Sequence, residues 1–314
     1  MAANPLDKLL KPRFPTVAVG IESDTASVVQ LDRTRGAFVV KRAASVNLSP
    51  ELIRPAFDSP NISDPAELGR ALTALLNSAG LLRQRKWSTS LPEAATRSAV
   101  VTIEGATRSR RETEEVFEWK IERTFGAAMS QLRLSREQLA PDANKQARYL
   151  VNAIRLEVLA EYEAVFASLG WHVGLVLPRH AGEEQWLRNG HQGDGLLLTA
   201  HDEGFTAVLV RADRILTLRS VFCDEAERDD ELHRVLLFYR QRTDAGKQDE
   251  TTSLNRLLVV GEHLDKARVA EIAEDTFGVR LKPLAAADVG LMIPPGDLGF
   301  DTIAAPAGLA RLAW

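Results

Sequence analysis

The feature that most constrains the fold is a pattern that occurs twice in the chain: three short β-rich runs separated by turn residues, followed by an amphipathic helix. One copy begins near Thr16 and the other near Gly195. The β-rich runs are 16–22, 27–31 and 37–46 in the first copy, and 196–200, 206–210 and 215–221 in the second. Strand-like runs joined by short polar breaks predict antiparallel meanders. Because an internal repeat outranks any short motif as evidence for fold, the sequence predicts a duplicated α/β core.

The helix after each meander has recognisable signals. In the first copy Asp64 is placed to cap the helix, Pro65 occupies its first position and Gly80 ends it. In the second copy apolar side chains recur at i, i+3, i+4 and i+7 spacing between Leu232 and Tyr239. The elements expected after that helix are a buried-type strand, a capped helix and a short strand, at 256–260, 265–278 and 279–281.

The stretch 87–154 departs from the repeat and is expected to form a separate small unit. Its predicted strands are 87–91, 98–103, 131–139 and 148–154. Ser109 and Glu112 have the spacing of a capping box, and the helix that follows carries Phe117, Ile121 and Phe125 on one face. We therefore expect a compact α+β subdomain inserted into the first half.

These elements predict the domain organisation. Residues 1–192 form the first half, with the insert at about 87–154, and residues 193–314 form the second half. Only one long helix fits between Val221 and Arg256, so the distal part of the second half should be small.

Composition narrows the class of protein. The 314 residues are 45% apolar and 26% charged, which is typical of a globular protein that can bury a sizeable core. The net charge of −4 argues against a nucleic-acid binder and against electrostatic attachment to an anionic membrane. A single cysteine, Cys223, excludes an internal disulfide and favours the cytoplasm. No apolar stretch reaches the ~20 residues of a membrane span, so any membrane connection should come through a partner.

The chain resembles a known family, the actin-like proteins of type IV pilus assembly (the PilM type), and more distantly the cell-division protein FtsA. The stretches 19–31 and 195–221 resemble the two phosphate hairpins of that fold. Residues 88–92 resemble the start of its inserted subdomain, and residues 259–263 with 307–310 resemble its adenosine loop and C-terminal helix. The resemblance covers nearly the whole chain in order. It implies an actin-like (ribonuclease H-like) α/β fold.

The departures from that family concern the nucleotide site. Each phosphate hairpin of the actin-like fold pairs an Asp with a nearby Gly, so that backbone N–H groups approach the phosphates and a carboxylate holds the water of Mg²⁺. In this chain Glu22 replaces the first Asp, the turn up to Thr25 lacks glycine, and Thr199 stands at the second Asp position. The adenosine loop keeps Gly261 but continues with Glu262. These changes predict a pseudo-ATPase with no catalytic residues, no metal and no bound ATP. Any nucleotide that was retained would contact Glu22, Thr25, Thr199 and Gly261.

The resemblance implies a function in protein assembly. It indicates a non-catalytic cytoplasmic scaffold of a type IV pilus or related secretion platform, held at the inner membrane by the cytoplasmic tail of a PilN-type single-span protein. The alternative left open is an active actin-like protein that binds and hydrolyses ATP with unusual phosphate loops.

The family places the groove for that tail between the first subdomain and its insert. The candidate contacts are the apolar side chains Trp87, Leu91, Phe117 and Ile121 and the basic cluster of Arg108, Arg110 and Arg111. Each apolar side chain is also open to a core role, and the basic cluster to a solvated helix start.

Overall fold

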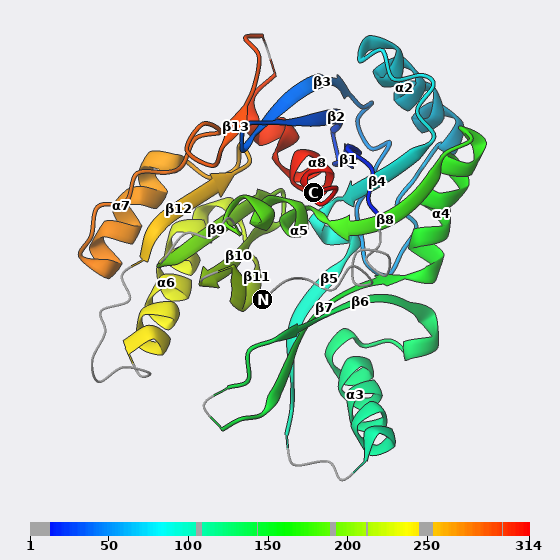
Figure 1. Cartoon of the computed structure of the whole chain (residues 1–314). Coiled ribbons are helices and arrows are strands. Elements are labelled where there is room, and N and C mark those ends of the chain that lie inside the picture. The colour runs from blue at the N-terminus through cyan, green and yellow to red at the C-terminus, as the bar shows by residue number, and fades with distance from the viewer. Residues whose placement is uncertain are drawn as a thin grey trace.

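The computed structural model of the chain describes residues 13–104, 109–142, 144–188, 193–211, 213–244, 254–296 and 298–314. Its elements form two larger β-sheets with helices packed on them and a third, smaller sheet (Figure 1). None of the described helices combines the length and the apolar character needed to cross a membrane.

The first sheet has six strands in the order β13-β3-β2-β1-β4-β8. The strands are β1 (Val17–Ile21), β2 (Thr25–Thr34), β3 (Ala37–Asn47), β4 (Lys86–Leu91), β8 (His172–Pro178) and β13 (Leu291–Met292). β1, β2 and β3 form an antiparallel meander, while β4 lies parallel to β1 and β8 lies parallel to β4. Helices α2 (Pro65–Ser78) and α4 (Leu156–Ser168) share an apolar core with this sheet.

The second sheet has four strands in the order β11-β10-β9-β12. They are β9 (Asp194–His201), β10 (Gly204–Arg211), β11 (Arg214–Phe222) and β12 (Leu254–Val260). Helices α6 (Arg228–Asp244) and α7 (Lys266–Phe277) pack against it through a core of their own. Asp265 caps α7 by accepting hydrogen bonds from two backbone N–H groups of the first turn.

The two sheets follow one plan. In each, an antiparallel meander is followed by a helix, and the fourth strand lies parallel to the first, giving the orders β3-β2-β1-β4 and β11-β10-β9-β12. This correspondence confirms the predicted repeat.

The second copy lacks the last predicted strand. Residues 279–281 do not pair, and only an isolated parallel bridge joins Leu257 to Pro283. Val279 is 43% exposed. Pro283, which follows the predicted strand, has no N–H to donate to a ladder, so the segment does not extend the sheet. The prediction of a strand at 279–281 is wrong.

The insert is smaller than predicted. It contains the sheet β5-β7-β6, built from β5 (Arg97–Ile103), β6 (Leu132–Leu139) and β7 (Ala147–Arg155), and the helix α3 (Arg110–Phe125). β4 does not belong to it, because this strand lies between β1 and β8 in the six-stranded sheet. The insert therefore begins at Arg97, about ten residues after the predicted boundary at 87.

The insert contacts both halves of the molecule. Arg188 forms two hydrogen bonds with Glu137 on β6, at 3.0 and 2.9 Å. Arg148 on β7 donates to the carbonyl of Leu216 on β11 at 2.6 Å. Apolar side chains of the insert also join the core cluster that contains residues of both larger sheets. In Figure 1 the insert lies below the two halves.

Two helices lie between the halves. α5 (Arg179–Glu183) follows β8 directly and was not predicted, whereas α8 (Phe300–Arg311) is the predicted C-terminal helix. The two helices approach closely because Gly182 and Gly308 face one another. A Cβ added to Gly308 would lie 1.8 Å from the carbonyl oxygen of Gly182.

Candidate functional site

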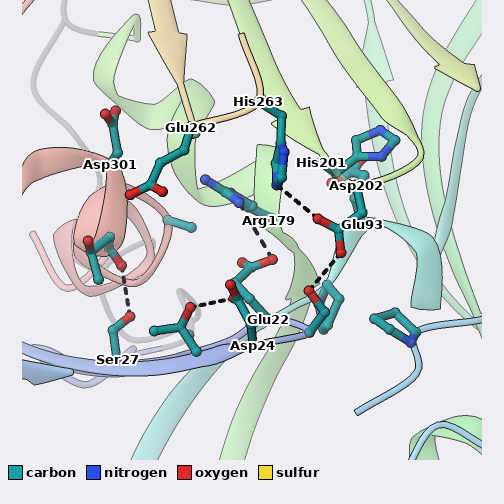
Figure 2. Close-up of a pocket in the computed structure, with 18 of the residues that line it drawn as sticks. Glu22, Asp24, Ser27, Glu93, Arg179, His201, Asp202, Glu262, His263 and Asp301 are labelled. Carbon is teal, nitrogen blue, oxygen red and sulfur yellow. Dashed lines mark hydrogen bonds and ion pairs between the residues drawn. The ribbon is translucent and has the colours of Figure 1, made fainter. Parts of the chain in front are cut away.

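A cavity of about 320 Å³, here called the cleft, lies where the two halves meet (Figure 2). Its wall contains the turn between β1 and β2, the turn between β9 and β10, the residues that follow β4, β8 and β12, and part of α8. The cleft therefore combines corresponding parts of both copies of the repeat.

The charged side chains of the cleft are placed by the ends of parallel strands. A Leu-Pro pair closes both β4 and β8, and the next residues are Glu93 and Arg179. β12 is followed by Gly261, whose φ of +102° suits glycine. β4 and β8 are adjacent and parallel, so Glu93 and Arg179 lie at the same edge of the first sheet, and Gly261 meets them from the second sheet.

Arg179 spans the cleft. Its Nη1 lies 3.5 Å from Oε2 of Glu22, and its Nε donates to Oε1 of Glu183 at 2.7 Å. Thr199 donates to the other oxygen of Glu183 at 2.5 Å. A Cβ added to Gly261 would lie 3.3 Å from Nη2 of Arg179, so the guanidinium also packs against the end of β12.

Glu93 connects three parts of the fold. Its Oε1 lies 2.6 Å from Nδ1 of His180 and accepts a hydrogen bond from Thr206 at 3.0 Å. Its Oε2 accepts from the backbone N–H of His180 at 3.3 Å. Glu93 follows β4, His180 lies in α5 and Thr206 lies on β10, so one carboxylate joins both halves through α5.

The buried carboxylates differ in their protonation. Burial raises the pKa of Glu22 to about 7, although the charge of Arg179 lowers it. Burial also raises the pKa of Glu93, but the charge of His180 and its hydrogen bond outweigh this and lower the pKa to about 2. Burial lowers the pKa of His180, but the charge of Glu93, its hydrogen bond and the charges of Glu184 and Glu183 together raise it above the usual value. Each partner thus favours the charged form of the other, as expected for an ion pair.

The two hairpin turns of the cleft are tied to each other. The hydroxyl of Ser23 donates to Oδ2 of Asp202 at 2.8 Å, and Nε2 of His263 lies 2.9 Å from Oδ1 of the same carboxylate. In Figure 2 the side chains of Asp202 and His263 meet beside Arg179 and Glu22. The turns that would flank a phosphate chain thus contact one another.

The wall of the cleft is predominantly acidic. Its carboxylates are Glu22, Asp24, Glu93, Asp202, Glu203, Glu262 and Asp301. The basic groups of the wall are Arg179, which is already paired, and the imidazoles of His201 and His263. An acidic wall repels a polyanion. Over the described ranges, no three His, Cys, Asp or Glu side chains are arranged to hold a metal ion.

A second cavity of about 250 Å³, here called the groove, lies between the insert and the first sheet. β8 is the last strand of the six-stranded sheet and β6 is the last strand of the three-stranded sheet, so both present a strand edge. The apolar side chains of its wall include Leu134, Ile154, Leu159, Leu175 and Leu177. Arg133, Asn152 and Glu163 add polar groups.

The structure places three of the four predicted cleft residues in the wall. Glu22, Thr25 and Gly261 line the cleft. Thr199 does not line it, because it is fully buried beneath the wall, where its hydroxyl bonds to Glu183.

Glu93, Arg179, His180 and Glu183 were missed by the sequence analysis. The repeated Leu-Pro at the ends of two strands, each followed by a charged residue, is the signal that could have found Glu93 and Arg179.

The predicted groove contacts need correction. Trp87 and Leu91 are fully buried in the core of the first half, where Trp87 stacks on Trp171 with ring centroids 4.7 Å apart. Phe117 and Ile121 are buried in the core of the insert. These four side chains pack cores and do not face the groove.

The predicted basic cluster is described only in part. Arg108 and the side chain of Arg110 lie outside the described residues. Arg111 is exposed on α3 and pairs with Glu115 at 2.8 Å.

Comparison with solved structures identifies the fold. A chain of the PilM–PilN type IV pilus biogenesis complex matches with a TM-score of 0.73 and 19% identity, over 96% of this chain and 99% of that one. The cytoplasmic domain of EpsL, an inner-membrane component of the type II secretion system of Vibrio cholerae, matches with a TM-score of 0.46 and 10% identity, over 95% and 93%. A Bacteroides thetaiotaomicron protein with an actin-like ATPase fold also has a TM-score of 0.46 and 10% identity, over 92% and 93%. No family model and no curated protein matches the sequence.

The repeated sheets, the inserted subdomain and the match over nearly the full length of both chains lead to one conclusion. This chain has the actin-like fold found in the PilM–PilN complex.

Proposed function

We propose that this chain is a non-catalytic scaffold of a type IV pilus or related secretion platform, and that it binds the cytoplasmic tail of a PilN-type single-span inner-membrane protein. The observation that carries the proposal is the groove between β8 and β6. It lies in a chain whose fold matches a structure of PilM with PilN over 96% of its length.

The groove has the features that bind an extended peptide. A tail lying along β8 or β6 would add a strand to the sheet and gain main-chain hydrogen bonds from its edge. Alternate side chains of the tail would point at the apolar wall, which includes Leu134, Leu175 and Leu177. Because the partner's tail lies on the cytoplasmic side of the inner membrane, such binding would hold the scaffold at that face.

The absence of catalysis is proposed from the cleft. Arg179 occupies the space between the first hairpin and Gly261, and it is held there by Glu22 and Glu183. Thr199, at the second Asp position, is buried and directed at Glu183. The side chains at the two Asp positions, Glu22 and Thr199, thus contact Arg179 and Glu183, which pair with each other.

Tail binding is tested with a substitution that fills the groove. Gly174 lines the groove, and a Cβ added there meets nothing within 4 Å, so Gly174→Lys places a long side chain in the groove without disturbing a core. We expect it to weaken binding of a fluorescent peptide, copied from the cytoplasmic tail of a PilN-type protein of the same organism, by more than about tenfold in anisotropy titrations.

The matched control is Gly299→Lys. Gly299 is exposed, its Cβ position is also open, and it lies outside the wall of the groove. This variant should bind the peptide like the wild type. A wild type that binds no such tail, or a Gly174→Lys variant with unchanged affinity, would overturn the proposal.

The proposed lack of nucleotide binding is tested by thermal melting. A ligand at 100 times its dissociation constant adds about 2.7 kcal/mol of stability. We expect the melting temperature to stay constant with millimolar Mg-ATP. A rise of several degrees would favour the alternative, an active ATP-binding assembly protein.

A further inference from the structure

The groove and the cleft share two stretches of chain. Glu93 lines the cleft, and Thr96, three residues later, lines the groove. Pro178 lines the groove, and the next residue, Arg179, lines the cleft. The two cavities are therefore separated by the turn after β4 and by the start of α5.

Each of these stretches is rigid within itself. The backbone N–H and the hydroxyl of Thr96 both donate to the carbonyl of Glu93 at 3.1 Å, which closes the turn η1 (Glu93–Ala95). On the other side, only Arg179 separates Pro178 from His180. A shift of Glu93 relative to His180 would therefore move the two walls of the groove relative to each other.

The pairing of β4 with β8 ends at Leu91 and Pro178, and beyond this point a bonded pair of side chains joins the two stretches. The carboxylate of Glu93 bonds to both the imidazole and the backbone N–H of His180, at 2.6 and 3.3 Å. Both residues are buried, with exposed fractions of 6% and 0%. Charge-assisted hydrogen bonds are among the strong ones, and removing one partner of a buried pair leaves the other unsatisfied.

We propose that Glu93 and His180 are positioning residues of the tail-binding groove, which they hold open at the end formed by Thr96 and Pro178. This inference rests on the tail binding proposed above. It gives the cleft a role in partner binding that needs no nucleotide, because the pair acts through its own bonds. Thr206, which also bonds to Glu93, ties it to β10 but not to either wall of the groove.

The pair also makes the groove sensitive to pH. A neutral imidazole with its proton on Nδ1 would keep the hydrogen bond to Glu93, but the charge that strengthens this bond requires a protonated His180. The charged groups that face the pair are Glu22, Arg179, Glu183, Glu184 and His201. Glu183 and Glu184 favour the protonated imidazole together with Glu93. Tail affinity should therefore fall as the pH rises through the raised pKa of His180, where the imidazole loses its proton.

The test compares Glu93→Gln with Glu262→Gln. Glu262 is exposed and lines the same cleft, and among the described contacts it bonds to neither wall of the groove. We expect Glu93→Gln to weaken binding of the PilN-type tail peptide by about tenfold, since it removes a charge-assisted hydrogen bond between the two stretches. It should also remove the loss of affinity at raised pH. Glu262→Gln should keep the wild-type affinity and pH profile.

Hydrogen exchange gives a second readout on the walls themselves. In Glu93→Gln, the amides of Thr96 and of β8 should exchange faster than in the wild type and in Glu262→Gln. If Glu93→Gln does not fold, the pH profile of the wild type carries the test alone.

The outcomes distinguish the two proposals. A wild type that binds the tail, with affinity and exchange unaltered in Glu93→Gln or with affinity that does not change with pH, overturns the positioning role and leaves the proposed function in place. A wild type that binds no tail overturns the proposed function itself.

Discussion

At the residue scale, two side chains determine what the cleft can hold. Glu22 is one methylene longer than the Asp expected in the first hairpin, and its carboxylate reaches Arg179. Arg179 is 12% exposed and lies against Gly261, so its guanidinium fills the space next to a residue that has no side chain. The two side chains are complementary, because each carries a charge opposite to that of the other in a largely buried setting.

Replacing Glu22 by Gln should change how stability depends on pH. Burial raises the folded pKa of Glu22 from 4.5 to about 7, so between these values the native state keeps a proton that the unfolded state releases. The contribution of Glu22 to stability therefore falls as pH rises from about 4.5 to about 7. In Glu22→Gln, the free energy of unfolding measured by urea denaturation should therefore fall less over this pH range.

Glu262→Gln is the control for this experiment, because Glu262 lines the same cleft but is exposed. Its pH profile should follow the wild type. A Glu22→Gln profile parallel to the wild type would contradict the shifted titration of Glu22.

Thr199→Val should reduce stability because it removes the hydrogen bond from Thr199 to Glu183. The Thr199 hydroxyl is a buried donor to this fully buried carboxylate, and valine keeps the shape but removes the donor. We expect a loss of about 1–3 kcal/mol in the free energy of unfolding, measured by urea denaturation. Thr25→Val removes only an exposed bond to Asp24 and should cost less. Equal losses in the two variants would argue against a buried bond at Thr199.

At the scale of elements, α5 exists because of its surroundings. Its five residues are too few to form a stable helix alone. Glu93 bonds to the backbone N–H of His180 near its start, and the indole N–H of Trp186, just after it, donates to the carbonyl of Ala304 in α8 at 2.8 Å. Close packing of α5 on α8 completes this support.

Gly308→Ala should disrupt that packing. Its Cβ would lie 1.8 Å from the carbonyl oxygen of Gly182, which is backbone and cannot move aside alone. We expect destabilisation of about 3 kcal/mol or more by chemical denaturation. Gly69→Ala, in α2, is the control: its Cβ position is open, and alanine at a helix interior should stabilise by about 0.5–1 kcal/mol. A Gly308→Ala variant as stable as the wild type would contradict the observed approach of the helices.

At the scale of the whole molecule, the insert is integrated with both halves. Leu139 and Leu150 of the insert belong to the same core cluster as Trp186 and Ile215. Glu137 and Arg148 add polar contacts with the segments on either side. We infer that the insert unfolds together with the rest of the chain.

Calorimetry of two alanine variants tests this inference. Leu150 lies in the shared core, whereas Phe117 lies in the insert's own core. We expect about 2–5 kcal/mol of destabilisation for each, with one unfolding transition in both, because the cores are coupled. A separate early transition in Phe117→Ala would show that the insert unfolds by itself.

The sequence by itself determined the elements that depend on nearby residues. The two meanders follow from alternating β-rich runs and their turns, and α2 and α7 begin where Asp64 and Asp265 cap them. Glu22, Thr25 and Gly261 could be assigned to the cleft because hairpin turns and the end of a repeated strand fix their place locally. The order of these elements was enough to indicate the duplicated fold.

Only the tertiary structure decided which distant residues meet. β4 belongs to the first sheet because it pairs in parallel with β1 and β8, and parallel pairing joins segments far apart in sequence. The same pairing brings Glu93 and Arg179, 86 positions apart, to one edge of the cleft, while Thr199 turns away from it to Glu183. It also directs Trp87 into a core instead of the groove. Local periodicity shows that a side chain is apolar or charged, but burial and charge pairing depend on the elements that pack against it.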